Sequence, residues 1–120
     1  MLKHEAHYTN LLKKEFNKYE GIKALYTDPL TDADGIPDLL VLNDHEREYA
    51  FVEVKKMNEP LRPNQTIWAQ KYIHKAFMYI FRVQACGRKW ILEQYIPKTG
   101  EVFQPIPDPL SLRDIVKEII

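Results

Sequence analysis

Hydrophobic residues in the first part of the chain recur at the spacing of a helix. A stripe of apolar residues three or four positions apart is formed by Tyr8, Leu12, Phe16 and Tyr19. This period predicts an amphipathic helix over residues 3–19, with Gly21 at the position of a helix C-cap. A short strand is expected over residues 22–26.

Two runs in the middle of the chain are typical of paired strands. Residues 27–35 are rich in turn-forming residues and end at Gly35. Residues 38–42 and 48–54 are mainly apolar and are separated by a polar stretch that begins at Asn43. This arrangement predicts a β-hairpin.

The second half of the chain predicts a helix, two strands and a final helix. Pro63 suits the first turn of a helix that runs to about Lys75 or Phe77, and strands are expected over residues 78–83 and 90–96. Three prolines close together are expected to prevent a regular element before the last helix: Pro105, Pro107 and Pro109. Ser111 and Asp114 resemble a capping box at the start of a helix that ends near residue 120. The predicted order α-β-β-β-α-β-β-α indicates an α/β fold, a mixed β-sheet flanked by helices.

Composition adds limits to this picture. The 120 residues fit a single domain spanning residues 1–120, and 45% of them are hydrophobic, enough for one core. Seventeen basic and 17 acidic side chains cancel, so any affinity for phosphate has to come from local clustering. The single cysteine, Cys86, rules out an internal disulfide, and no apolar segment is long enough for a signal peptide or a membrane span. We therefore expect a cytoplasmic, intracellular protein that is not exported and not inserted in a membrane.

Three charged residues stand out in the predicted hairpin. Asp38 begins the first strand, and Glu53 and Lys55 lie two apart near the end of the second. Because strand side chains alternate, Glu53 and Lys55 share one face, and burying two charges there is costly unless they are paired or coordinate a metal. Each residue also has an ordinary explanation: Asp38 suits a turn, and the other two suit the exposed end of a half-buried strand.

The combination of motifs is more specific than its parts. A Gly-Ile-Pro-Asp turn at 35–38, the run Phe-Val-Glu-Val-Lys at 51–55 and the helix entry Leu-Arg-Pro-Asn-Gln at 61–65 occur in this order, and 53–55 is the only acid-any-Lys triplet. In these residues the chain resembles the PD-(D/E)XK nuclease superfamily and, within it, the virus-type replication-repair nuclease (VRR-NUC) family. The resemblance implies a restriction-endonuclease-like core.

The resemblance also implies roles for individual residues. Asp38 and Glu53, with the backbone carbonyl of Val54, would bind Mg²⁺ or Mn²⁺. Lys55 would orient and help deprotonate the attacking water or stabilise the phosphate, and Gln65 would support the lysine or the phosphate.

The family has a further glutamate in its first helix, and Glu5 is the candidate here. Glu5 falls near the middle of the apolar stripe, whereas Glu15 lies at its flank and Glu20 at the helix end. If the first turn projects beyond the core, Glu5 is instead a solvated acid at a helix N-terminus. The nearby pair His4 and His7 is interpreted as surface histidines, because nothing completes a zinc site around them.

Both acidic and basic residues occur near the motifs, and they have opposite effects on phosphate binding. Asp28, Asp32 and Asp34 precede the Gly-Ile-Pro-Asp turn, where they build turns, repel phosphate or add metal ligands. A basic cluster could compensate, or could be a solvated helix face. Its members are Lys55, Lys56, Arg62, Lys71 and Lys75.

The function implied is hydrolysis of DNA phosphodiester bonds by a metal-dependent nuclease. A structure-selective endonuclease of the Holliday junction resolvase kind, acting as a homodimer on DNA that includes branched forms, is the leading hypothesis. A defence or restriction-type nuclease, a catalytically silent nucleic-acid-binding or interaction module and a structural protein without a nucleic-acid partner remain open.

Overall fold

The computed structural model describes residues 3–27, 35–46, 48–72, 77–83, 90–96, 101–105 and 111–120. These residues form three helices and six strands. In chain order they are α1 (Lys3–Phe16), β1 (Ile22–Tyr26), β2 (Leu39–Asn43), β3 (Glu48–Lys56), α2 (Pro63–Tyr72), β4 (Phe77–Val83), β5 (Trp90–Ile96), β6 (Glu101–Pro105) and α3 (Leu112–Ile119).

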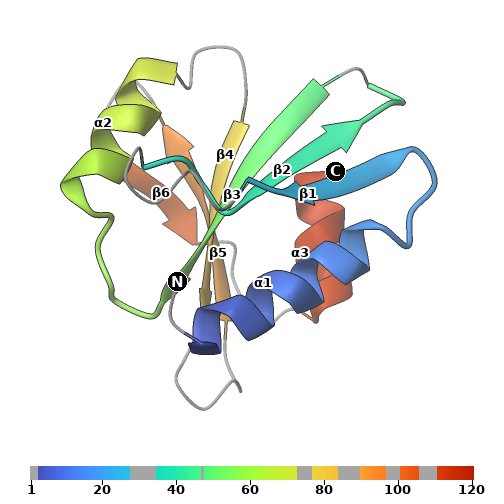
Figure 1. The fold of residues 1–120 in the computed structure, drawn as a ribbon, viewed down its shortest axis with the longest axis horizontal. Coiled ribbons are helices and arrows are strands. Elements are labelled where there is room, and N and C mark those ends of the chain that lie inside the picture. Colours follow the sequence, from blue (N-terminus) through green and yellow to red (C-terminus); the bar gives the residue numbers. More distant parts are fainter. Residues whose placement is uncertain are drawn as a thin grey trace.

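All six strands belong to one mixed sheet in the order β1-β2-β3-β4-β5-β6 (Figure 1). The pair β3 and β4 is parallel, and the other neighbouring pairs are antiparallel. A parallel pair needs a crossover connection, which α2 provides. The end of β3 therefore leads directly into the helix that covers one face of the sheet.

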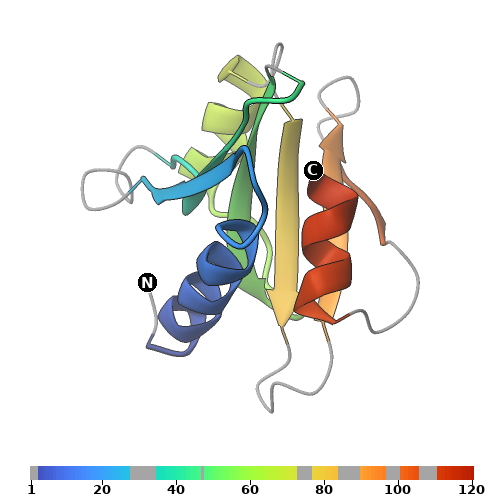
Figure 2. The same cartoon turned by 90° about the vertical axis from the view of Figure 1, so that its right-hand side faces the viewer.

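The helices cover both faces of the sheet (Figure 2). Helices α1 and α3 pack side by side on one face, over a core that includes Leu12, Phe16, Val52 and Ile115. Helix α2 packs on the other face, where Phe51 and Trp68 meet edge to face with ring centroids 5.0 Å apart. Side-chain alternation along β3 places Glu53 and Lys55 on this second face, which we call the α2 face.

The predicted α/β class with a mixed sheet between helices is confirmed. The strand expected over residues 22–26 and both hairpin strands form, and the Ser111 side chain accepts a hydrogen bond from the Asp114 amide at 3.2 Å, as a helix cap does. The order differs from the prediction by one strand. Strand β6 was not expected, and it ends on Pro105 at the edge of the sheet, next to a register shift in its pairing with β5 between Glu93 and Tyr95; edges and bulges are the places where strands tolerate proline.

Two predicted helix ends were wrong. Helix α1 stops at Phe16, and turns carry the chain to Gly21, whose positive φ of 79° bends the backbone into β1 rather than capping the helix. Helix α2 ends at Tyr72, and Phe77 already belongs to β4. Several residues singled out from the sequence lie outside the described residues: Asp28, Asp32, Asp34, Lys75 and Cys86. None of the helices described is both long and apolar enough to span a bilayer.

Candidate active site

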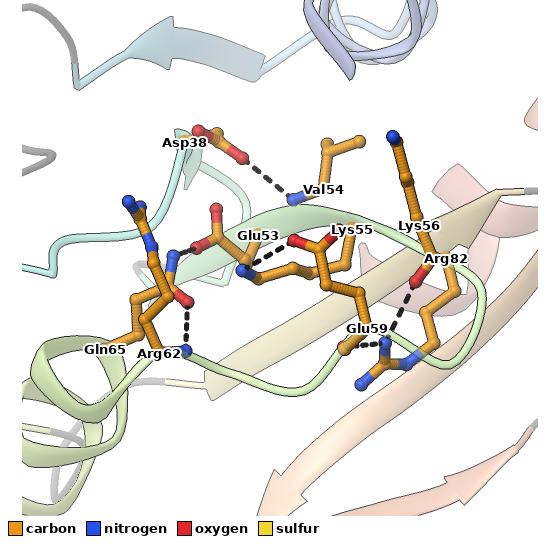
Figure 3. Close-up of polar contacts among 9 residues, drawn as sticks. All are labelled: Asp38, Glu53, Val54, Lys55, Lys56, Glu59, Arg62, Gln65 and Arg82. Atoms are coloured by element: carbon orange, nitrogen blue, oxygen red, sulfur yellow. Dashed lines mark hydrogen bonds and ion pairs between the residues drawn. The ribbon is translucent and has the colours of Figure 1, made fainter. Parts of the chain in front are cut away.

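Strand pairing places Asp38 next to Glu53. Leu39 of β2 lies opposite Val52 of β3 in an antiparallel pair, so the residue before Leu39 lies beside the residue after Val52. One oxygen of Asp38 accepts a hydrogen bond from the Val54 amide at 2.9 Å (Figure 3). The Asp38 backbone carbonyl accepts one from the Thr27 amide at 3.1 Å. The backbone of Asp38 is thus bonded to the chain just after β1, and its carboxylate is bonded to β3.

Gly35 allows the turn before Asp38 to lie against the start of α2. Its φ is +78°, and a Cβ built at this position would come within 2.2 Å of the Asn64 carbonyl oxygen and 2.7 Å of the Gln65 nitrogen. A side chain cannot be accommodated there without moving backbone. The Gly-Ile-Pro-Asp turn and the helix entry are therefore in direct contact, although Gly35 and Asn64 lie 29 positions apart in the sequence.

Gln65 joins the start of α2 to Glu53. Its side-chain nitrogen donates a hydrogen bond to a Glu53 oxygen, and its side-chain oxygen accepts one from the Arg62 amide at 2.8 Å. Both side chains are 3% exposed. The structure thus places Gln65 on the carboxylate of Glu53, and the predicted support of the lysine or phosphate by Gln65 stays a prediction.

Burial changes the acidity of Glu53. Desolvation is the main reason why the pKa of this carboxyl rises from 4.5 to about 10, and neighbouring Asp38 adds to the rise by accepting a hydrogen bond from the protonated form and by repelling the ionised one. Lys55 and Arg62 oppose the rise with their positive charges. Glu53 therefore carries a proton at neutral pH unless a cation replaces it.

Lys55 is also buried on the α2 face. It is 3% exposed, and its ammonium donates to an oxygen of Glu59 at 3.3 Å. In Figure 3 the Lys55 side chain runs along the same side of β3 as Glu53, so that carboxyl and ammonium groups face one region. The structure brings Asp38, Glu53 and Lys55 together at this end of β3, and their predicted catalytic roles stay predictions.

The donor set suits a hard divalent cation. Two adjacent carboxyl groups, one of them buried, need either a proton or a cation between them, and Mg²⁺ and Mn²⁺ take carboxylate oxygens with waters in the remaining positions. No group of three or more His, Cys, Asp or Glu side chains able to hold a metal occurs among the described residues. Backbone oxygens and water suit the other positions, and the carbonyl of Val54 as a ligand stays a prediction.

The Glu5 prediction is not decided by the geometry. Glu5 lies in α1, but its side chain, like that of His4, is outside the described ones. Glu15 is bonded to Lys18 at 3.1 Å and Glu20 is exposed. His7 is exposed and stacks its ring edge-on against Tyr8. Glu5 is therefore kept as the predicted first-helix ligand.

The residues of the predicted basic cluster differ in their exposure to solvent in the folded chain. Arg62 and Lys71 are exposed, and Lys56 is half-buried, whereas Lys55 is buried in the site. The exposed members lie at the entrance and along the outer side of α2, where their charges can meet phosphate groups.

Sequence reasoning missed Glu59, Arg82 and Glu93. Arg82 forms an ion pair with Glu93 and donates to the backbone carbonyls of Lys56 and Glu59 (Figure 3). A signal was present, because Arg82 is a charged residue in the otherwise apolar run Phe-Met-Tyr-Ile-Phe-Arg-Val. Its position opposite Lys55 could not be read without the register of β3 and β4.

Comparisons with known proteins show the family of the chain and a related fold. A sequence model of the VRR-NUC domain family matches residues 6–90, which include all four predicted catalytic residues. Comparison with curated proteins gives no match. Among solved structures, the fold is similar to that of Hjc, a Holliday junction resolvase from the archaeal hyperthermophile Archaeoglobus fulgidus, with a TM-score of 0.53 and 19% identity over 73% of this chain and 70% of that one. Because the family match spans well over half of the 120 residues, the chain belongs to the VRR-NUC domain family, a PD-(D/E)XK type of nuclease domain.

Proposed function

We propose that the protein is a metal-dependent nuclease that hydrolyses phosphodiester bonds in DNA. The observation that carries the proposal is the buried group on the α2 face, in which Asp38 and Glu53 lie side by side and Lys55 lies two residues further along the same strand. Family membership supports nuclease chemistry in general, whereas metal dependence and DNA as the substrate are both proposals.

Asp38 and Glu53, with Glu5 and the Val54 carbonyl as predicted further ligands, would hold Mg²⁺ or Mn²⁺. The bound ion would supply Lewis-acid polarisation of the scissile phosphate and a lowered pKa for the attacking water. Asp38 is held for this role by the Val54 amide, and Glu53 by the Gln65 side chain. Binding of the cation requires that Glu53 release its proton.

Lys55 provides the positive charge on the other side of the reacting group. Its ammonium has three N–H donors, of which Glu59 uses one. The remaining donors can orient the water and stabilise charge that develops on the phosphate. Because Lys55 is fixed on a central strand, this donor is in place before the substrate arrives.

We further propose a structure-selective endonuclease that acts on branched DNA, as a homodimer inside the cell. The likeness of the fold to an archaeal Holliday junction resolvase supports this choice of substrate. A monomer with extents of 35 × 32 × 29 Å offers one short surface, whereas a junction presents two strands to be cut. Two copies of the chain would match that symmetry.

The decisive experiment measures cleavage of labelled single-stranded, duplex, flap and four-way-junction DNA with Mg²⁺, Mn²⁺ or EDTA. Wild type is compared with Lys55→Ala and Asp38→Ala, and with exposed matched controls Lys117→Ala on α3 and Asp44→Ala in the β2–β3 turn. We expect the two site variants to lose roughly 100-fold or more of the rate, and the controls to cut normally. Preference for the junction would support the resolvase subtype.

Two results would overturn the proposal. Cutting that persists in EDTA or in Asp38→Ala would contradict metal-dependent chemistry at this site. No cutting of any DNA by a folded, metal-loaded wild type would favour a catalytically silent binding module if DNA binding weakens as salt rises, and a protein without a nucleic-acid partner if no binding is found.

A further inference from the structure

The connection between β3 and α2 is bonded to β4 by the side chain of Arg82 and by the Met57 amide, which donates to the Val83 carbonyl at 2.8 Å. Arg82 lies directly opposite Lys55 in the parallel register of β3 and β4. Its guanidinium donates to the carbonyl of Lys56 at 3.1 Å and to that of Glu59, while Glu93 neutralises its charge. Since the Arg82 side chain is only 11% exposed, these bonds are shielded from water.

A groove of about 290 Å³ lies beside the connection and is lined by residues 57–60 and by the strand residues Arg82, Ile91 and Glu93. Asn58 adopts a positive φ of 66°, and the turn is closed by a backbone bond from Glu59 to Lys56 at 3.2 Å. The Met57 amide therefore holds the start of this turn, and the Arg82 guanidinium holds its Glu59 end beside the groove.

The turn places the Glu59 side chain within hydrogen-bond distance of the Lys55 ammonium. Two positive side chains, Lys55 and Arg82, lie next to each other on the α2 face, and two negative ones, Glu59 and Glu93, balance them. Glu59 is the most exposed of the four at 37%, whereas Lys55 is almost fully buried. A lysine side chain has four rotatable bonds, so the contact with Glu59 restricts where its ammonium points.

We propose that Glu59 is a positioning residue for Lys55, and that Arg82 acts through Glu59 by holding the turn that carries it. The proposal rests on the proposed nuclease function, because Lys55 is the reacting donor. Glu59 fixes one N–H of the ammonium and so directs the other two toward the phosphate. The Nε and Nη1 donors of Arg82 go to Glu93 and to the backbone carbonyls of Lys56 and Glu59, so its role in this proposal is to hold the turn and not to bind the substrate.

The first test observes the ammonium group directly in metal-free protein. In protein labelled with ¹⁵N-lysine, a buried and bonded ammonium exchanges its protons slowly and gives a detectable NMR signal, which Lys55→Ala assigns. We expect Glu59→Ala to broaden this signal away, Glu59→Gln to retain it because an acceptor oxygen remains, and Arg82→Lys to weaken it because lysine lacks the planar fork. Glu15→Ala, which removes the partner of the exposed Lys18, is the matched control and leaves the Lys55 signal unchanged.

The second test measures cleavage by the same variants after their fold is checked by circular dichroism. Glu59→Ala and Glu59→Gln remove the same negative charge, so any effect of that charge on DNA binding is common to both. We expect kcat to fall roughly 10- to 100-fold in Glu59→Ala with little change in KM, and most of it to return in Glu59→Gln. Arg82→Lys lowers kcat in the same direction.

Either of two results overturns the inference. A Lys55 signal that survives in Glu59→Ala would show that Glu59 does not hold the ammonium. Wild-type or higher kcat in Glu59→Ala, with the signal lost, would show that the contact does not serve the reaction. If wild type cuts no DNA, the nuclease proposal fails on its own, while the NMR measurement still decides whether Glu59 and Arg82 hold Lys55.

Discussion

The carboxyl group of Glu53 makes the stability of the metal-free protein depend on pH in a defined direction. Burial and the neighbouring Asp38 raise the pKa of this group from 4.5 to about 10 in the folded chain. Between these two values the folded protein holds a proton that the unfolded chain has released. Rising pH therefore favours unfolding, so this stabilisation is fully present below pH 4.5 and is lost as the pH rises toward 10.

The substitution Glu53→Gln removes this dependence. A glutamine can accept the bond from Gln65 and donate to Asp38, as the protonated glutamic acid does, but it has no proton to lose. One proton of difference corresponds to about 1.4 kcal/mol per pH unit, so wild type should lose roughly 3 kcal/mol more than the variant between pH 6 and pH 8. This is a large part of the total stability of a small domain.

The measurement is urea unfolding in EDTA at pH 6, 7 and 8, followed by tryptophan fluorescence. Glu118→Gln, an exposed site on α3, controls for the loss of one negative charge. Addition of Mg²⁺ should then stabilise wild type at pH 8 and leave Glu53→Gln unchanged, because the cation needs the ionised carboxylate. Parallel loss of stability in wild type and Glu53→Gln from pH 6 to pH 8 would refute the reasoning, since Glu53 would then be ionised in the metal-free protein.

Three further predictions concern the elements around the site. Gly35→Ala should destabilise the protein by at least about 1–2 kcal/mol, measured by urea unfolding, because of its positive φ and its contact with Asn64; a neutral result would mean that the turn does not touch α2. Gln65→Ala should weaken Mg²⁺ binding measured by calorimetry roughly 10- to 100-fold, whereas unchanged affinity would show that Glu53 needs no support. Ser111→Ala should cost about 1 kcal/mol through the lost bond to the Asp114 amide without altering DNA cleavage, and a change in cleavage would contradict a purely structural role for that cap.

Local patterns were enough to predict most helices and strands, and also that Glu53 and Lys55 share one face of β3. A period of two along β3 puts Glu53 and Lys55 on one face whatever the strand pairs with, because alternation is a property of the extended backbone. The turn before Asp38 and the start of α2 were also readable, since glycine and proline restrict the backbone locally. Strand β6 was not predicted because it contains a proline. Proline is mostly confined to edge strands and bulges, and the local sequence does not show whether a strand will lie at the edge of a sheet.

The sequence alone determined that the carboxylate and the lysine share one face of β3, and that an aspartate stands directly before the preceding strand β2. Tertiary structure decided the hydrogen-bond partner of each group. Asp38 bonds to the Val54 amide, Gln65 to Glu53, and Glu59 to Lys55. These contacts depend on strand register and on the crossover through α2, which follow from burying apolar surface across the whole sheet. Local periodicity fixes the direction of a side chain, and only long-range packing fixes its partner.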